Sequence, residues 1–369
     1  MSKTDILFVS ASVGSGHVRA AEALLKTARL LYPELSVRHI DVVHYVRPSF
    51  KKIFFDPYIP MAKKMPGLWK ALYEQTDRPL MRRGMDAATT ALKKSAGSAF
   101  FAELEKQQPA YILATHVLPA RLSDIFIKET ASKTQLGILV TDYVLHQFWI
   151  ASKEARYFVA APAMKEELAH AGVAQENITE SGIPVDPVFY EKKNPAHLKE
   201  RFGIPKERPV VLLLGGGSGL SKMDEVAQAL FSASRPLSLI AIAGDNEILA
   251  KSLRLLAPPP HIHLSVVGWT DVMDEYMRIA DVIVSKPGGM TMTEAITLGT
   301  PFVAVQPIPG QEEANAAFLT EHNYGAAVQT LDALPQIVEA IVNGKRTFAV
   351  KKPQRAAEVI LERIVKTLS

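Results

Sequence analysis

His17 follows a short glycine turn at 14–16 (Gly-Ser-Gly) that separates an apolar run from a helical repeat. The spacing predicts a helix starting near Val18, and the positive end of a helix dipole disfavours the imidazolium form. The ring is therefore expected to be neutral near pH 7 and able to accept a proton, as a general base must be. A histidine that merely caps the turn is the structural alternative, and the neighbouring glycines at a strand's carboxyl end favour the catalytic role.

A second glycine turn, 286–289 (Lys-Pro-Gly-Gly), ends another apolar run. Glycine lets the backbone approach a ligand and the amides of a helix start bind anions, so this turn predicts a diphosphate site. We expect the helix to begin at Thr291 or Thr293. Glu294 could then accept hydrogen bonds from a vicinal diol, or it could simply complement the helix dipole. The residues predicted to form this site are Gly288, Gly289, Met290, Thr291 and Glu294.

A further glycine cluster, 215–219, follows the apolar run 209–214, and Gly216, Gly217 and Ser218 are its expected ligand contacts. It lacks the spacing to Gly-Lys-Ser/Thr that a Walker A loop requires. A dinucleotide fingerprint at the first turn, with Asp41 as the ribose acid, is also disfavoured, because Arg19 stands where the third glycine is needed.

The loop after the apolar run 301–306 carries Gln311, Glu312 and Asn315. Because it also leaves the carboxyl end of a predicted strand, we expect these side chains to face the same crevice as Gly288 and Glu294. Amide and carboxylate groups together suit sugar hydroxyls, which both donate and accept hydrogen bonds. Three polar loops at one crevice are not easily explained as independent turns.

Asp142, His146 and Trp149 follow the predicted strand 137–141. Asp142 and His146 are four residues apart and could pair, the acid orienting the imidazole. A packed aromatic turn with a structural contact is the alternative, and the residue types leave both open. The chain has no cysteine and its carboxylates are scattered, so we expect neither a metal nor a cofactor.

The segment 47–83 concentrates the positive charge of the chain. Nine basic residues against three acidic ones give it a net charge of +6, whereas the whole chain carries +4. Six large aromatic residues are interleaved with these charges. This pattern favours an anionic membrane surface, with nucleic acid or a merely solvated face as alternatives. The residues expected at the membrane are Lys51, Lys52, Phe54, Phe55, Lys63, Lys64, Trp69, Arg82 and Arg83.

The 369 residues are 48% hydrophobic and 22% charged, which is typical of globular proteins and excludes a disordered chain. The length predicts two domains. We expect no signal peptide, and no apolar run approaches the roughly 20 residues of a membrane-spanning helix. The absence of cysteine fits a reducing cytosol.

Ten short apolar runs alternate with helical stretches on either side of a proline-rich segment at 181–195. Most runs are continuously hydrophobic, as expected for parallel strands buried on both faces, so the pattern predicts two doubly wound α/β domains. We expect the domains at 1–188 and 189–352, with a final helix in 353–369. The predicted strands are 6–11, 37–43, 110–115, 137–141, 157–161, 209–214, 237–243, 262–267, 281–285 and 301–306.

Five ordered motifs make the chain similar to the processive diacylglycerol glycosyltransferases and monogalactosyldiacylglycerol synthases, a family that also holds the lipid-II N-acetylglucosaminyltransferase. The motifs are 14–21, 141–149, 181–187, 286–295 and 309–315. The resemblance implies a GT-B fold, in which two Rossmann-like domains face a cleft. It also implies acceptor lipid at the N-terminal domain, a UDP-sugar at the C-terminal domain, inversion at the anomeric carbon, and a final helix that crosses back to the first domain.

By this resemblance His17 matches the family's candidate base, Glu294 the acid that holds the ribose, and Gln311 with Glu312 the pair that holds the sugar hydroxyls. The activity it implies is transfer of a hexose from UDP-glucose or UDP-galactose to diacylglycerol. The chain would need no cofactor or metal and would not bind nucleic acid. It would act while docked on anionic lipids at the cytoplasmic face of the cell membrane. A UDP-sugar 2-epimerase and a non-catalytic UDP-sugar sensor are the alternatives.

Overall fold

The computed structural model describes residues 3–46, 67, 97–215, 222–350 and 354–368. The chain forms two compact units. The first comprises Met1–Pro187, Pro309–Gln311 and Gln354–Ser369, and the second comprises Val188–Ile308 and Glu312–Pro353. Apart from position 67, the predicted membrane segment lies outside the described residues.

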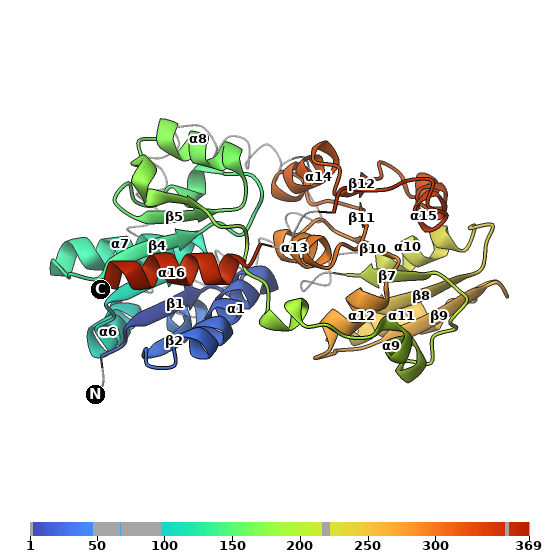
Figure 1. The fold of residues 1–369 in the computed structure, drawn as a ribbon, viewed down its shortest axis with the longest axis horizontal. Helices are drawn as coiled ribbons and strands as arrows, with labels where there is room; N and C mark the ends of the chain where they lie inside the picture. Colours follow the sequence, from blue (N-terminus) through green and yellow to red (C-terminus); the bar gives the residue numbers. More distant parts are fainter. Residues whose placement is uncertain (1–2, 47–66, 68–96, 216–221, 351–353, 369) are drawn as a thin grey trace. The chain divides into compact units, whose positions relative to one another are not determined.

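Six parallel strands form the sheet of the first unit, in the order β2-β1-β3-β4-β5-β6 (Figure 1). Strands β1 and β3 are buried along their whole length, because helices cover both faces of the sheet. The strands are β1 (Ile6–Ser10), β2 (Val37–Asp41), β3 (Tyr111–Ala114), β4 (Gln135–Leu139), β5 (Arg156–Val159) and β6 (Ile178–Glu180). The helices are α1 (Ser15–Leu31), α6 (Ser98–Gln107), α7 (Val117–Thr130), α8 (Pro162–His170) and α16 (Ala356–Leu368).

The final helix α16 belongs to this first unit, although it follows the whole second unit in the sequence. It packs beside α1, as Figure 1 shows. The apolar residues Ile360, Leu361 and Ile364 form its buried face. Their helical spacing therefore buries one stripe of α16 against the unit.

The second unit repeats the architecture with the strand order β12-β11-β10-β7-β8-β9. Its strands are β7 (Val210–Leu214), β8 (Leu237–Ile242), β9 (Ile262–Val267), β10 (Val282–Ser285), β11 (Phe302–Ala304) and β12 (Gly325–Ala327). Its helices are α9 (Pro195–Arg201), α10 (Met223–Leu230), α11 (Glu247–Arg254), α12 (Met273–Ile279), α13 (Gly289–Leu298), α14 (Gln311–Glu321) and α15 (Leu334–Val342). Strands β7, β8 and β10 pack with α10, α11 and α15 in one hydrophobic core.

Each sheet has one topological switch point. In the first unit, β2 and β3 lie on opposite sides of β1, and in the second unit, β8 and β10 lie on opposite sides of β7. At a switch point, the loops after two neighbouring strands run in opposite directions and leave a crevice between them. Ligands of doubly wound folds bind in this crevice, at the carboxyl ends of the strands. The predicted glycine turns follow β1, β7 and β10, so they stand at the two switch points.

The predicted fold class is confirmed, and each of the ten predicted runs overlaps an observed strand. Strands β6 and β12 were not predicted; each has three residues and forms a sheet edge, where burial imposes little pattern. The predicted helix starts were wrong by a few residues. Helix α1 begins at Ser15 and α13 at Gly289, because the extended glycines Gly14 and Gly288 are the N-caps.

Candidate functional site

His17 lies in the first turn of α1, at the switch point of the first sheet. Its Nδ1 atom lies 2.9 Å from the backbone carbonyl oxygen of Thr115, directly after β3. The same nitrogen lies 2.8 Å from Oγ1 of Thr141, beyond β4. The Thr115 hydroxyl in turn donates to the His17 carbonyl at 2.8 Å. Two threonines from neighbouring strands therefore hold both the ring and the backbone of His17.

These contacts fix the tautomer of the ring. A carbonyl oxygen can only accept a hydrogen bond, so Nδ1 must carry the proton that it donates to Thr115. In the neutral ring, Nε2 is then the nitrogen with the lone pair. Burial lowers the pKa of His17 from 6.5 to about 4, against the opposing effect of the Thr115 carbonyl. The neutral ring was predicted, but burial is its main cause and not the helix dipole.

His116 and Trp149 stand beside this ring. The ring centroids of His17 and His116 are 4.6 Å apart with an edge-on geometry, and Trp149 lies 6.1 Å from His17. The Nδ1 atom of His116 accepts from the Leu118 amide, so this histidine caps α7. Burial, and then the neighbouring His17, hold the pKa of His116 well below its ordinary value. The enclosure therefore favours two neutral rings side by side.

Asp142 and His146 lie in the loop that begins at Thr141, and both are buried. His146 caps the short helix Gln147–Trp149 by accepting from the Phe148 amide at Nδ1, 3.1 Å away. Asp142 accepts a hydrogen bond from the amide of Gln311, which belongs to the first unit. The structure thus gives each residue a hydrogen-bond partner, and their catalytic role stays a prediction.

At the switch point of the second sheet, the turn after β10 is held by two buried side chains. Asn315 donates to the carbonyl of Pro287 at 3.1 Å, and Ser285 donates to the carbonyl of Leu214 at the end of β7, also at 3.1 Å. Gly288 is the N-cap of α13, and among the described residues a methyl group on it would meet no atom within 4 Å. Backbone amides at the start of a helix suit an anion.

The predicted carboxylates flank this turn. Glu294 is buried in α13 with 1% of its surface exposed. Glu312 accepts from the Ile308 amide through Oε2 at 2.7 Å, and its Oε1 lies 3.8 Å from the buried Nζ of Lys286. Asn315 and Glu312 thus contact the 286–289 turn, whereas Gln311, predicted beside them, donates to Asp142 in the first unit. Met290 is buried and Thr291 half-buried in the first turn of α13, whereas Gly216, Gly217 and Ser218 lie outside the described residues.

Sequence reasoning missed Thr115, His116 and Thr141 as partners of the base. A signal was present in the sequence. Thr115 directly follows β3, and Thr141 lies two residues beyond the end of β4. Which of these polar residues approaches His17 depends on the strand order, which the sequence does not state. The order β1-β3-β4 puts both loops beside the glycine turn.

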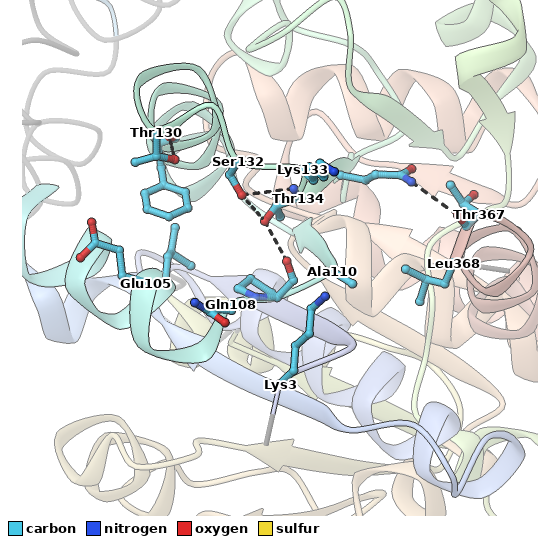
Figure 2. A pocket seen from close by; sticks show the side chains of 14 residues that line it. Lys3, Glu105, Gln108, Ala110, Thr130, Ser132, Lys133, Thr134, Thr367 and Leu368 are labelled. Atoms are coloured by element: carbon cyan, nitrogen blue, oxygen red, sulfur yellow. Dashed lines mark hydrogen bonds between the residues drawn. The ribbon is translucent and has the colours of Figure 1, made fainter. Parts of the chain in front are cut away.

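The first unit also contains a cavity of about 510 Å³, remote from His17. It lies at the amino ends of β3 and β4, where Gln135 donates to the Thr367 carbonyl. Figure 2 shows Ser132 and Thr134 in its wall, hydrogen-bonded to each other. Lys3, Gln108 and Leu368 contribute other parts of its wall. This is the sheet edge opposite the switch point, so the cavity is not part of the predicted chemistry.

Two doubly wound parallel sheets with ligand-type turns at their switch points define a two-domain α/β protein of the GT-B class. Solved structures agree over nearly the whole chain. MurG of Acinetobacter baumannii matches with a TM-score of 0.59 at 17% identity, covering 98% of this chain and 99% of MurG. HepE of Anabaena in complex with UDP-glucose matches with 0.58 at 16% identity, covering 99% of both chains. At such identities the likeness concerns the fold.

Sequence comparison matches family models to both parts of the chain. Residues 17–185 match the monogalactosyldiacylglycerol synthase model, and residues 210–367 match the glycosyltransferase family 28 C-terminal domain. The processive diacylglycerol beta-glucosyltransferase of Bacillus subtilis (strain 168) is 25% identical, covering 98% of this chain and 94% of the relative. Its counterpart in Bacillus mycoides (strain KBAB4) is 28% identical, covering 89% and 82%. The chain thus matches a monogalactosyldiacylglycerol synthase domain followed by a glycosyltransferase family 28 C-terminal domain, and it is similar over nearly its whole length to proteins named processive diacylglycerol beta-glucosyltransferases.

None of the helices in the described part of the chain is long and apolar enough to cross a bilayer.

Proposed function

We propose that this protein is an inverting glycosyltransferase that moves a hexose from a UDP-sugar to the free hydroxyl of diacylglycerol. The acceptor oxygen bonds to the anomeric carbon while its proton passes to Nε2 of His17. The bond from that carbon to the β-phosphate oxygen breaks, and its electron pair leaves with UDP. Attack from the face opposite the leaving group inverts the anomeric configuration.

The hydrogen bond from His17 to Thr115 carries this proposal. It leaves Nε2 with the lone pair at a switch point, which is the form a general base needs. A pKa of about 4 keeps the ring unprotonated at neutral pH. It also makes the free base weak, and an anionic donor beside the ring would raise this pKa by stabilising the imidazolium.

The second unit supplies the donor site in this proposal. The amides at the start of α13 bind the diphosphate, and Glu294 holds the ribose diol. Glu312 and Asn315 lie beside the turn after β10 and are placed to serve the sugar hydroxyls. Relatives named diacylglycerol beta-glucosyltransferases and neighbours solved with UDP or UDP-glucose support this choice of substrates.

The membrane is the expected place of action, since diacylglycerol does not leave the bilayer. The charge of +6 on residues 47–83 supports docking on anionic lipids at the cytoplasmic face. A product assay tests the whole proposal. The protein is incubated with diacylglycerol in anionic liposomes and with UDP-glucose or UDP-galactose, and the lipids are identified by mass spectrometry. We expect hexosyl-diacylglycerol to form with one of the two UDP-sugars. Formation of free sugar or of an epimerised sugar, without glycolipid, would overturn the proposal.

A further inference from the structure

His116 is a second histidine at the switch point of the first sheet, and the proposed proton transfer does not use it. It stands two residues after the end of β3, behind Thr115, and is the N-cap of α7. Its ring centroid lies 4.6 Å from that of His17 and 6.5 Å from that of Trp149. A substrate bound at His17 is therefore close to the imidazole of His116.

The hydrogen bond at Nδ1 fixes the tautomer of His116. The backbone amide of Leu118 can only donate, and it donates to Nδ1 at 3.1 Å, so this nitrogen carries the lone pair. In the neutral ring the proton is then on Nε2. His17 has the opposite tautomer, because its Nδ1 donates to the Thr115 carbonyl. The two neighbouring rings thus offer one hydrogen-bond acceptor and one hydrogen-bond donor.

The surroundings of His116 keep its ring neutral. Burial, and then the neighbouring His17, hold the pKa of His116 well below its ordinary value. The positive end of α7 acts in the same direction. A protonated His116 would also repel the positive charge that His17 acquires when it accepts a proton. The neutral ring donates from Nε2 without this repulsion, and neutral imidazoles polarise substrate carbonyls in this way in other enzymes.

Capping α7 does not account for an imidazole at this position. Serine, threonine, aspartate and asparagine are the preferred N-cap residues, and each accepts from the first amides of a helix with a shorter side chain. His17 and His116 are both half-buried, so a ligand can reach their rings. Among the described residues, no acceptor pairs with Nε2 of His116. The N–H of this ring is thus placed to serve a bound molecule.

The acceptor lipid of the proposed reaction complements this pair of rings. Diacylglycerol has one hydroxyl, which gives up its proton as it reacts, and an ester on the neighbouring glycerol carbon. The carbonyl oxygen of that ester can only accept a hydrogen bond. Nε2 of His17 matches the hydroxyl, and the N–H of His116 matches the carbonyl oxygen. A lipid held at both groups has its hydroxyl oriented for attack before the reaction begins.

We infer that His116 binds the acceptor lipid by donating from Nε2 to the ester carbonyl oxygen next to the reactive hydroxyl. This inference rests on the proposed function for the identity of the acceptor. It makes His116 a substrate-binding residue that selects lipids with an ester beside the hydroxyl and turns that hydroxyl toward His17. His116 transfers no proton, since its N–H bond stays intact throughout the reaction.

The test compares two acceptors that differ in one carbonyl group. Dioleoylglycerol and an analogue with an ether in place of the ester next to the free hydroxyl are each presented in anionic liposomes, with the UDP-sugar that the wild type uses. For the wild type we expect kcat/KM to be about tenfold lower with the ether, because one hydrogen bond is lost. His116→Ser keeps a cap on α7 but has no N–H, so it should be about tenfold less active with the ester and show no preference.

Two further variants serve as comparisons. His116→Gln has an amide N–H of similar reach to Nε2 and should keep much of the preference for the ester. His170→Ser removes an exposed imidazole from α8 of the same unit and should behave like the wild type. Thermal unfolding reports whether His116→Ser is folded, and His116→Thr, which offers the same kind of cap, takes its place if it is not.

The outcomes separate the inference from the proposed function. A wild type that uses both acceptors equally well would overturn the role of His116 while the function stands. The same holds if His116→Ser loses activity with both acceptors by one factor and keeps the preference for the ester, since a purely structural role gives that result. A wild type that glycosylates neither lipid would overturn both.

Discussion

The imidazole of His17 donates from Nδ1 to the carbonyl oxygen of Thr115, at a distance of 2.9 Å. This bond joins the loops of β1 and β3 across the switch point of the first sheet. It fixes which nitrogen can take a proton, and burial then keeps that nitrogen unprotonated at neutral pH. If His17 is the base, a backbone carbonyl orients it where many enzymes use a carboxylate.

Thr141 should act as a positioning residue for this ring. Thr141→Val removes the hydroxyl 2.8 Å from Nδ1, and we expect kcat to fall about tenfold with KM for the donor unchanged. Thr141→Ser keeps the hydroxyl and should restore most of kcat. Steady-state kinetics check this, and a loss in Thr141→Ser with none in Thr141→Val would show that packing of the methyl group matters instead.

The pH profile should reflect the lowered pKa of His17. With a pKa of about 4 in the folded protein, the base is unprotonated throughout the range around 6.5. We therefore expect protonation of His17 to lower kcat/KM only as the pH approaches about 4. An acidic limb at 6.5 that disappears in a His17 variant would contradict the burial of the ring.

The same shift predicts a loss of stability in acid. Between pH 6.5 and about 4, unfolded His17 binds a proton that the folded protein does not, so unfolding is favoured as the pH falls. The contribution of His17 to the free energy of unfolding is intact above 6.5 and declines down to about pH 4. Denaturant unfolding of wild type and His17→Gln at several pH values checks it, and the variant should lose less stability in that window.

The fold was predictable because continuous apolar runs mark parallel strands wherever they are buried on both faces. The site was predictable only in part. The glycine turn indicated His17, but its partners Thr115 and Thr141 are 98 and 124 residues away in the sequence, and no spacing pattern links them. Strand order brings them together. The turn after β10 was predicted as a ligand site, whereas the burial of Lys286 beside Glu312 is a tertiary property.

Gly288→Ala should separate ligand binding from folding. The backbone at Gly288 has φ −71° and ψ 137°, which alanine adopts without strain, and its Cβ would meet no atom of the described residues within 4 Å. We expect stability equal to the wild type or slightly higher, with UDP affinity reduced at least tenfold, because the methyl group occupies the place of the phosphates. Calorimetry with UDP and thermal unfolding measure both. Undiminished UDP binding would place the diphosphate elsewhere.

Membrane docking should depend on the basic segment. Replacing Lys51, Lys52, Lys63 and Lys64 by glutamate changes the charge of residues 47–83 from +6 to −2. We expect this variant to bind UDP normally and to lose binding to anionic vesicles, with activity falling in parallel. Added salt should likewise weaken vesicle binding by the wild type, since exposed charges are screened within about 10 Å at 0.1 M. Vesicle co-sedimentation is the measurement, and unchanged binding would assign the segment to a solvated face.

The most direct test of the account is the rate of glycolipid formation by His17→Ala relative to the wild type, measured with saturating UDP-sugar and diacylglycerol in anionic liposomes. Loss of a general base predicts a fall of about 10²- to 10⁴-fold. The affinity for UDP should be unchanged, because the proposed donor site lies in the second unit. A variant that forms glycolipid at the wild-type rate would contradict the assignment of His17 as the base.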